Sequence, residues 1–129
     1  MTTTYLRAIA ILGAIVAFTA VPVVTSAHHG GDVEWGDGPL GPITGTATKF
    51  TFQFPHVFVD VDVAEEGDVA HWTLVTRWTP TILREHGWSR DSIKPGDTLK
   101  IGYLPHVQRP HIGQMVSIEI NGKPLPLAF

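Results

Sequence analysis

Histidines are the residues of this chain best suited to chemistry, and all seven of them lie after residue 27. A neutral imidazole is the commonest protein ligand for borderline metal ions. Nitrogen-rich sites without thiolates suit Cu(II), Ni(II) or Zn(II), and the affinity order places copper first. The chain has two adjacent histidines and three that each follow a proline, so we predict a copper site, with zinc as the alternative, built from His28, His29, His56, His106 and His111.

The segment before His28 has the pattern of a secretory signal peptide. Arg7 supplies a positive start, residues 8–24 are apolar apart from one threonine, and Thr25-Ser26-Ala27 offers the small residues of a cleavage site. Cleavage there leaves His28 with a free α-amine of pKa near 8, whose proton a metal displaces readily near neutral pH. The alternative is an uncleaved membrane anchor, although the run is slightly short for a span of about 20 residues.

Composition limits the remaining possibilities. The net charge is −3, which argues against a nucleic-acid partner because such partners require a basic face. No cysteine is present, so an exported domain of this size needs an apolar core or a ligand to hold it together. We expect a signal peptide over residues 1–27, a flexible Gly/Pro-rich arm over 28–42 and a β-barrel domain over 43–129. The expected location is the periplasm or outside the cell, with membrane contact only through an uncleaved signal segment.

Apolar residues alternate with polar ones over several short stretches, which is typical of half-buried strands. Thr79-Pro80 opens a short helix and Gly87 ends it. Strands are predicted around residues 45–54, 57–63, 69–77, 99–103 and 116–120, with a short last strand within 123–129. This order favours a small OB-like Greek-key barrel of five or six antiparallel strands, with the helix between strands three and four. A β-sandwich with one helical insert is the alternative.

The barrel hypothesis predicts that several of the histidines lie close together. In such a barrel the first and fourth connections lie beside one binding face, so His56, His106 and His111 would converge there, within reach of His28 on the arm. The competing interpretation is that loop histidines are simply exposed or bond to nearby carbonyls. His71 is expected on a strand surface, and His86 in the last turn of the helix.

Three stretches together resemble a family of small, uncharacterised exported bacterial proteins. They are A-H-H-G at 27–30, G-T-A-T-K-F-T-F-Q-F-P-H-V at 45–57 and I-L-R-E-H-G-W-S-R-D-S-I-K-P-G-D at 82–97. The family pattern has N-P-H in the second stretch and G-W-[ST]-R-D-x-L-K-P-G-D in the third, and this chain departs from it at Phe54, where the family has Asn. The resemblance implies export and a β-barrel fold, and it carries no established activity.

These observations favour a single-domain, non-enzymatic exported protein that holds a metal for storage, delivery or sensing on behalf of another exported protein. Two alternatives stay open. One is a metal-free adaptor that binds a partner protein or small ligand on the barrel face. The other is an oxidative copper enzyme with an N-terminal histidine brace, which needs a second histidine and an open coordination position.

Overall fold

The computed structural model describes residues 35–128, so the predicted signal peptide, His28 and His29 lie outside the described residues. Within residues 35–128, no helix is both long enough and apolar enough to span a membrane. The elements are β1 (Leu40–Phe52), β2 (Val57–Glu65), β3 (Asp68–Val75), α1 (Pro80–Glu85), β4 (Thr98–Pro105), β5 (Ile112–Ile120) and β6 (Lys123–Pro124).

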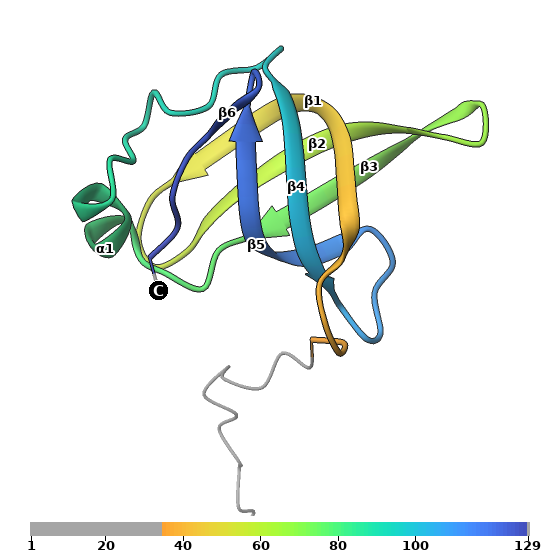
Figure 1. The fold of residues 1–129 in the computed structure, drawn as a ribbon, viewed down its shortest axis with the longest axis horizontal. Helices are drawn as coiled ribbons and strands as arrows, with labels where there is room; N and C mark the ends of the chain where they lie inside the picture. Colours follow the sequence, from red (N-terminus) through yellow and green to blue (C-terminus); the bar gives the residue numbers. More distant parts are fainter. Residues whose placement is uncertain (1–34, 129) are drawn as a thin grey trace, which may run out of the picture.

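The strands form a single sheet that closes on itself (Figure 1). Its order is β3-β2-β1-β4-β5-β6, with antiparallel neighbours, and a parallel pairing of β3 with β5 completes the ring. Strands close in sequence therefore pair first, and the last long strand returns to β3. The predicted mainly β fold, with one short helix between the third and fourth strands, is confirmed. The alternative of two packed sheets does not fit this single closed sheet.

Strand β1 pairs with two different strands, one along each half of its length. Its first half pairs with β4 over Leu40–Thr46, and its second half pairs with β2 from Thr46 onward. Gly45 lies next to the change of partner at Thr46, and an added Cβ there would sit 2.4 Å from the Asp62 carbonyl oxygen. The chain enters the sheet at Leu40, so residues 40–42 of the expected arm belong to β1. The sequence did not predict this start of the strand, because glycine and proline, here Gly41 and Pro42, usually break strands.

A β-bulge between Ala47 and Lys49 changes which face of β1 points inward. The predicted alternation placed Phe50 and Phe52 on one face together with Phe54, and Ala47 on the other. In the structure, however, both Ala47 and Phe52 are buried. The alternation also fails at its end, since the strand stops at Phe52 and Phe54 is 77 % exposed.

The core fills the ring with aliphatic side chains from every long strand. Strand β2 contributes a valine at each alternate position, as predicted, and β3, β4 and β5 add Leu74, Leu99, Ile101 and Met115. Leu83 of α1 and Trp88 extend this core. The Trp88 indole donates to the Pro126 carbonyl oxygen (2.7 Å), so the helix region and the C-terminal segment are held together.

Candidate functional site

The β4–β5 loop, residues 106–111, carries two of the predicted ligands and anchors the first described residues. The His106 amide donates to the Ile112 carbonyl oxygen (2.9 Å), which closes the loop. Trp35 forms a β-bridge with His106, its ring lies edge-on to the imidazole at 5.6 Å, and the Gly36 amide bonds to the Pro105 carbonyl oxygen. The chain that follows the two adjacent histidines is therefore attached at this loop.

The side chain of His106 is used within the loop. Its Nδ1 accepts hydrogen bonds from the backbone amides of Gln108 (3.0 Å) and Arg109 (3.2 Å). An Nδ1 that accepts is unprotonated, so the ring proton of the neutral imidazole sits on Nε2. Neither nitrogen then offers a free lone pair to a metal, and this arrangement favours a structural role for His106.

His111 is oriented differently and faces a carboxylate. Its backbone is left-handed (φ 57°), and its ring lies edge-on to Trp72 at 5.1 Å. Its Nε2 lies 3.5 Å from Oε2 of Glu65, and the other oxygen of Glu65 accepts from the Trp72 indole (2.8 Å). Trp72 also packs edge-on against Tyr103, whose pKa is raised by burial and by the nearby charge of Glu65.

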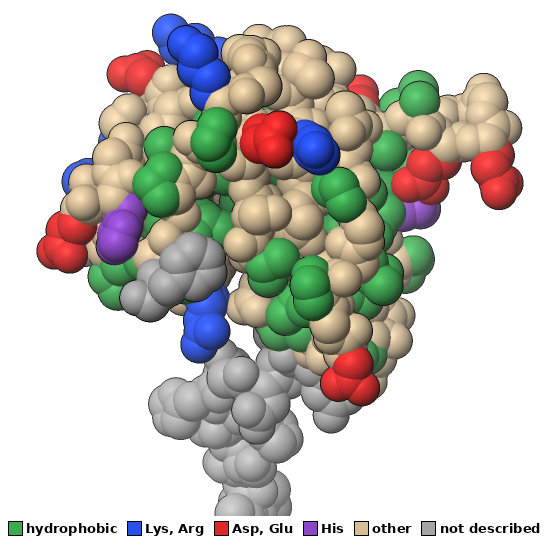
Figure 2. Space-filling model, viewed as in Figure 1, with side chains coloured by type: hydrophobic (Ala, Val, Ile, Leu, Met, Phe, Trp, Pro, Cys, Tyr) green, Lys and Arg blue, Asp and Glu red, His purple; other side chains and the backbone are tan. Residues whose placement is uncertain are grey.

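The pair of Glu65 and His111 is spaced as two ligands of one ion. Tetrahedral ligands at about 2.0–2.2 Å from a metal lie roughly 3.3–3.6 Å from each other. The separation of 3.5 Å falls in that range and is longer than a good hydrogen bond. Both side chains line an open hollow with Glu66 and Asp68, so an ion there would be reached from solvent. Figure 2 shows acidic side chains along the protruding β2–β3 hairpin, with a histidine beside them.

His56 does not join the other two loop histidines. It is exposed in the turn between β1 and β2, which lies beside α1, whereas the β4–β5 loop lies near the start of β1 (Figure 1). The expected convergence of the three histidines therefore needs correction. The two turns flank opposite ends of β1, since His56 follows the end of the strand at Phe52, whereas His106 pairs with Trp35 before the strand begins at Leu40. Among residues 35–128, no group of three or more His, Cys, Asp or Glu is placed to hold a metal.

The remaining histidines lie where the sequence placed them. His71 is on the outer face of β3 and pairs with Asp62 of β2 (Nδ1–Oδ1 2.6 Å). On the same face Asp60 accepts from the Thr73 hydroxyl (2.7 Å), so these carboxylates have cross-strand partners. His86 is the C-cap residue of α1.

Glu65 is a site residue that the sequence analysis missed, because the predicted strand ended near Val63 and β2 continues to Glu65. The position of Glu65 in the sequence could nevertheless have indicated its role. The buried valines of β2 occupy odd positions from Val57 to Val63, and Glu65 continues that series. A carboxylate in phase with a buried face must find a polar partner, and here it meets the Trp72 indole.

Sequence comparison assigns the chain to a family. A family model described as a family of unknown function, DUF6152, matches residues 16–115, which is most of the chain. The chain belongs to this family. Comparisons with curated proteins and with solved structures give no match. The family agrees with the resemblance to uncharacterised proteins and assigns no activity.

Proposed function

We propose that the chain is an exported metal-binding protein that holds copper(II), with zinc(II) as the alternative, at the barrel end formed by Glu65 and His111. The remaining ligands are the α-amine and ring of His28 and the ring of His29. His106 supports the site by holding Trp35, and His56 is not a ligand. Of the ligands expected from the sequence, the proposal therefore keeps His28, His29 and His111. It adds Glu65 and leaves out His56 and His106.

The attachment of Trp35 is the observation that carries the proposal. Trp35 bridges to His106, and the His106 amide bonds to the Ile112 carbonyl oxygen, next to His111. An extended chain spans at most about 3.6 Å per residue, so His28 stays within about 25 Å of Trp35. This length supports the proposal that His28 and His29 reach Glu65 and His111.

The donor set suits the proposed ions. An amine, imidazoles and one carboxylate are nitrogen and oxygen donors of borderline character, which Cu(II) and Zn(II) accept and for which copper has the higher affinity. Such a set fits a carrier that passes its metal to another exported protein. The pKa of a free α-amine, about 8, makes uptake easier as pH rises through neutrality.

Metal titration of the mature chain, starting at His28, tests the proposal. We expect one Cu(II) per chain, and His111→Ala or Glu65→Gln should weaken binding about 10- to 100-fold. One alanine added before His28 should weaken binding similarly, because the amine moves away from the ring. His56→Ala and His71→Ala are matched controls that should leave affinity unchanged. Equal affinity in all these variants, or no uptake of copper or zinc, would overturn the proposal.

A further inference from the structure

Beyond Ala47, one edge of β1 has no strand beside it among the strands that the structure describes. Strand β4 pairs only with Leu40–Thr46, and Ala47 then exchanges backbone hydrogen bonds with Gly96 (2.8 Å) and Asp97 (2.9 Å). After this point no segment within residues 35–128 bonds to that edge, although the opposite edge stays paired with β2 as far as Phe52. Unpaired edges are sites where another extended chain can add.

The alternation of hydrogen bonds shows which groups this edge presents. The Val57 carbonyl oxygen accepts from the Thr76 amide, so Val57 directs its peptide groups toward β3. Its partner across β1–β2 is Phe52, which therefore belongs to a pair that is not hydrogen-bonded and directs its N–H and C=O away from β2. Phe50, two residues earlier, does the same. Two donors and two acceptors thus face outward.

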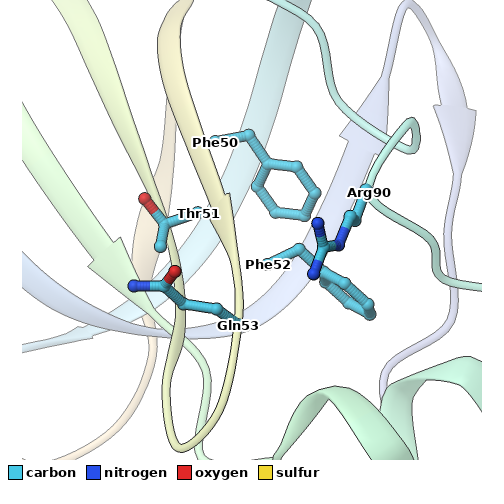
Figure 3. Close-up of a pocket in the computed structure, with 5 residues that line it drawn as sticks. All are labelled: Phe50, Thr51, Phe52, Gln53 and Arg90. Carbon is cyan, nitrogen blue, oxygen red and sulfur yellow. The ribbon is translucent and has the colours of Figure 1, made fainter.

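A hollow of about 270 Å³ lies at this edge, lined by Phe50, Thr51, Phe52, Gln53 and Arg90. Figure 3 shows the two phenylalanine rings pointing toward the Arg90 guanidinium, while the side chains of Thr51 and Gln53 point the other way. The hollow therefore combines an open strand edge with the half-buried Phe50 and a positive charge, whereas Phe52 is 5 % exposed and belongs to the core.

Arg90 stands on a fixed loop and lacks an ion-pair partner among the described residues. The Ser89 amide donates to the Ser92 hydroxyl (2.8 Å) and the Asp91 amide to the Ser89 hydroxyl (3.1 Å), which orders the backbone around it. The Arg84 guanidinium lies 5.2 Å from the Phe52 ring centroid and adds a second cation nearby. Two guanidinium groups therefore lie near the hollow, and the natural complement of a guanidinium is an anion.

We propose that this edge binds the C-terminal end of an extended peptide from a partner protein. The peptide adds as a short strand beside Phe50 and Phe52, and its terminal carboxylate pairs with Arg90, as in known modes of strand addition and carboxylate capture. A chain end fits better than a passing strand, because the pairing of Ala47 with Gly96 and Asp97 closes the edge at that side. The site is separate from the metal site and does not depend on it.

The probe is a peptide selected for binding to the mature chain from random synthetic pentapeptides with free C-termini. The selection is carried out in EDTA. We expect a selected peptide to lose affinity about tenfold or more when its C-terminus is amidated or when Arg90→Gln is introduced. Arg109→Gln, in the β4–β5 loop, removes the same charge elsewhere and should change nothing. Amide hydrogen exchange at Phe50 and Phe52 should slow when the peptide binds.

Each other outcome contradicts the proposal. Failure to select any peptide shows that the edge is not a binding site. Equal affinity for the acid and amide forms assigns recognition to an internal group, and unchanged exchange at Phe50 and Phe52 excludes strand addition. Because EDTA removes metal, these results are independent of the copper titration.

Discussion

His106 and His111 belong to one loop, yet their side chains have different surroundings. Two backbone amides occupy Nδ1 of His106, whereas His111 faces the carboxylate of Glu65. The sequence identified both residues as candidates from their type and their position after a proline. It could not separate them, because the direction of each ring depends on a loop backbone that no periodic pattern encodes.

Replacing His106 tests this division of roles. We expect His106→Ala to lower the free energy of unfolding by about 1–2 kcal/mol, since two amides lose their acceptor and Trp35 loses a ring contact. Copper affinity should stay within a few-fold of the parent. Urea unfolding and copper competition measure the two effects, and a loss of affinity as large as that of His111→Ala would contradict the structural role.

A second single residue, Asp97, is expected to make the stability of the fold depend on pH. Its carboxylate accepts from the Asn121 side chain (3.0 Å) and the Lys94 amide (2.7 Å), and these bonds lower its pKa below the ordinary 3.8. A lowered pKa means that the contribution to stability is complete above about pH 4 and is lost as pH falls through the folded-state pKa. Asn121→Gly keeps the left-handed backbone (φ 50°) and should raise that pKa toward 3.8. An NMR titration of the Asp97 carboxyl that is unchanged by the substitution would refute this assignment.

At the scale of elements, alternation predicted most strands, and Thr79-Pro80 and Gly87 predicted the helix, but neither predicted the strand ends or the bulge in β1. Strand β5 begins at Ile112, earlier than expected, because its first residues pair with β3 on one side and continue the pairing with β4 on the other. The free edge of β1 was also hidden, since a sequence does not state which strand lacks a neighbour. The second strand was predicted to end near residue 63, so Glu65, the partner of His111, was not recognised.

The close approach of β2 to β1 depends on the absence of a side chain at Gly45. An added Cβ would lie within 3 Å of the Asp62 carbonyl oxygen and of two valine side chains of β2. We expect Gly45→Ala to lower the free energy of unfolding by about 1–3 kcal/mol through overpacking. Gly41→Ala, where nothing lies within 4 Å of the added Cβ, is the matched control and should change stability by less than about 0.5 kcal/mol. Similar effects in both variants, measured by urea unfolding, would show that close approach is not the reason for Gly45.

At the scale of the whole molecule, the parallel pairing of β3 with β5 turns a sheet into a ring. The order of three strands, a helix and further strands was enough to predict this architecture. It was not enough to place the loops, and the expectation that the first and fourth connections meet failed for His56. Closure gathers one core from all long strands, so stability should respond as one unit.

Replacing Leu74 tests whether the core unfolds as one unit, because Leu74 is fully buried on β3 between β2 and β5. We expect Leu74→Ala to lower the free energy of unfolding by about 2–5 kcal/mol, the usual cost of a large cavity. Val69→Ala on the same strand, at a position 52 % exposed, should cost less than about 1 kcal/mol. Loss of structure on β3 alone, with the other strands unchanged in hydrogen exchange, would argue against a single core.

Intact mass and metal content, measured on one sample purified natively from an exporting host, test the central claim most directly. The account predicts a chain that begins at His28 and carries about one copper or zinc ion. A chain that begins at His28 yet holds no metal and takes up none when copper or zinc is supplied would contradict it.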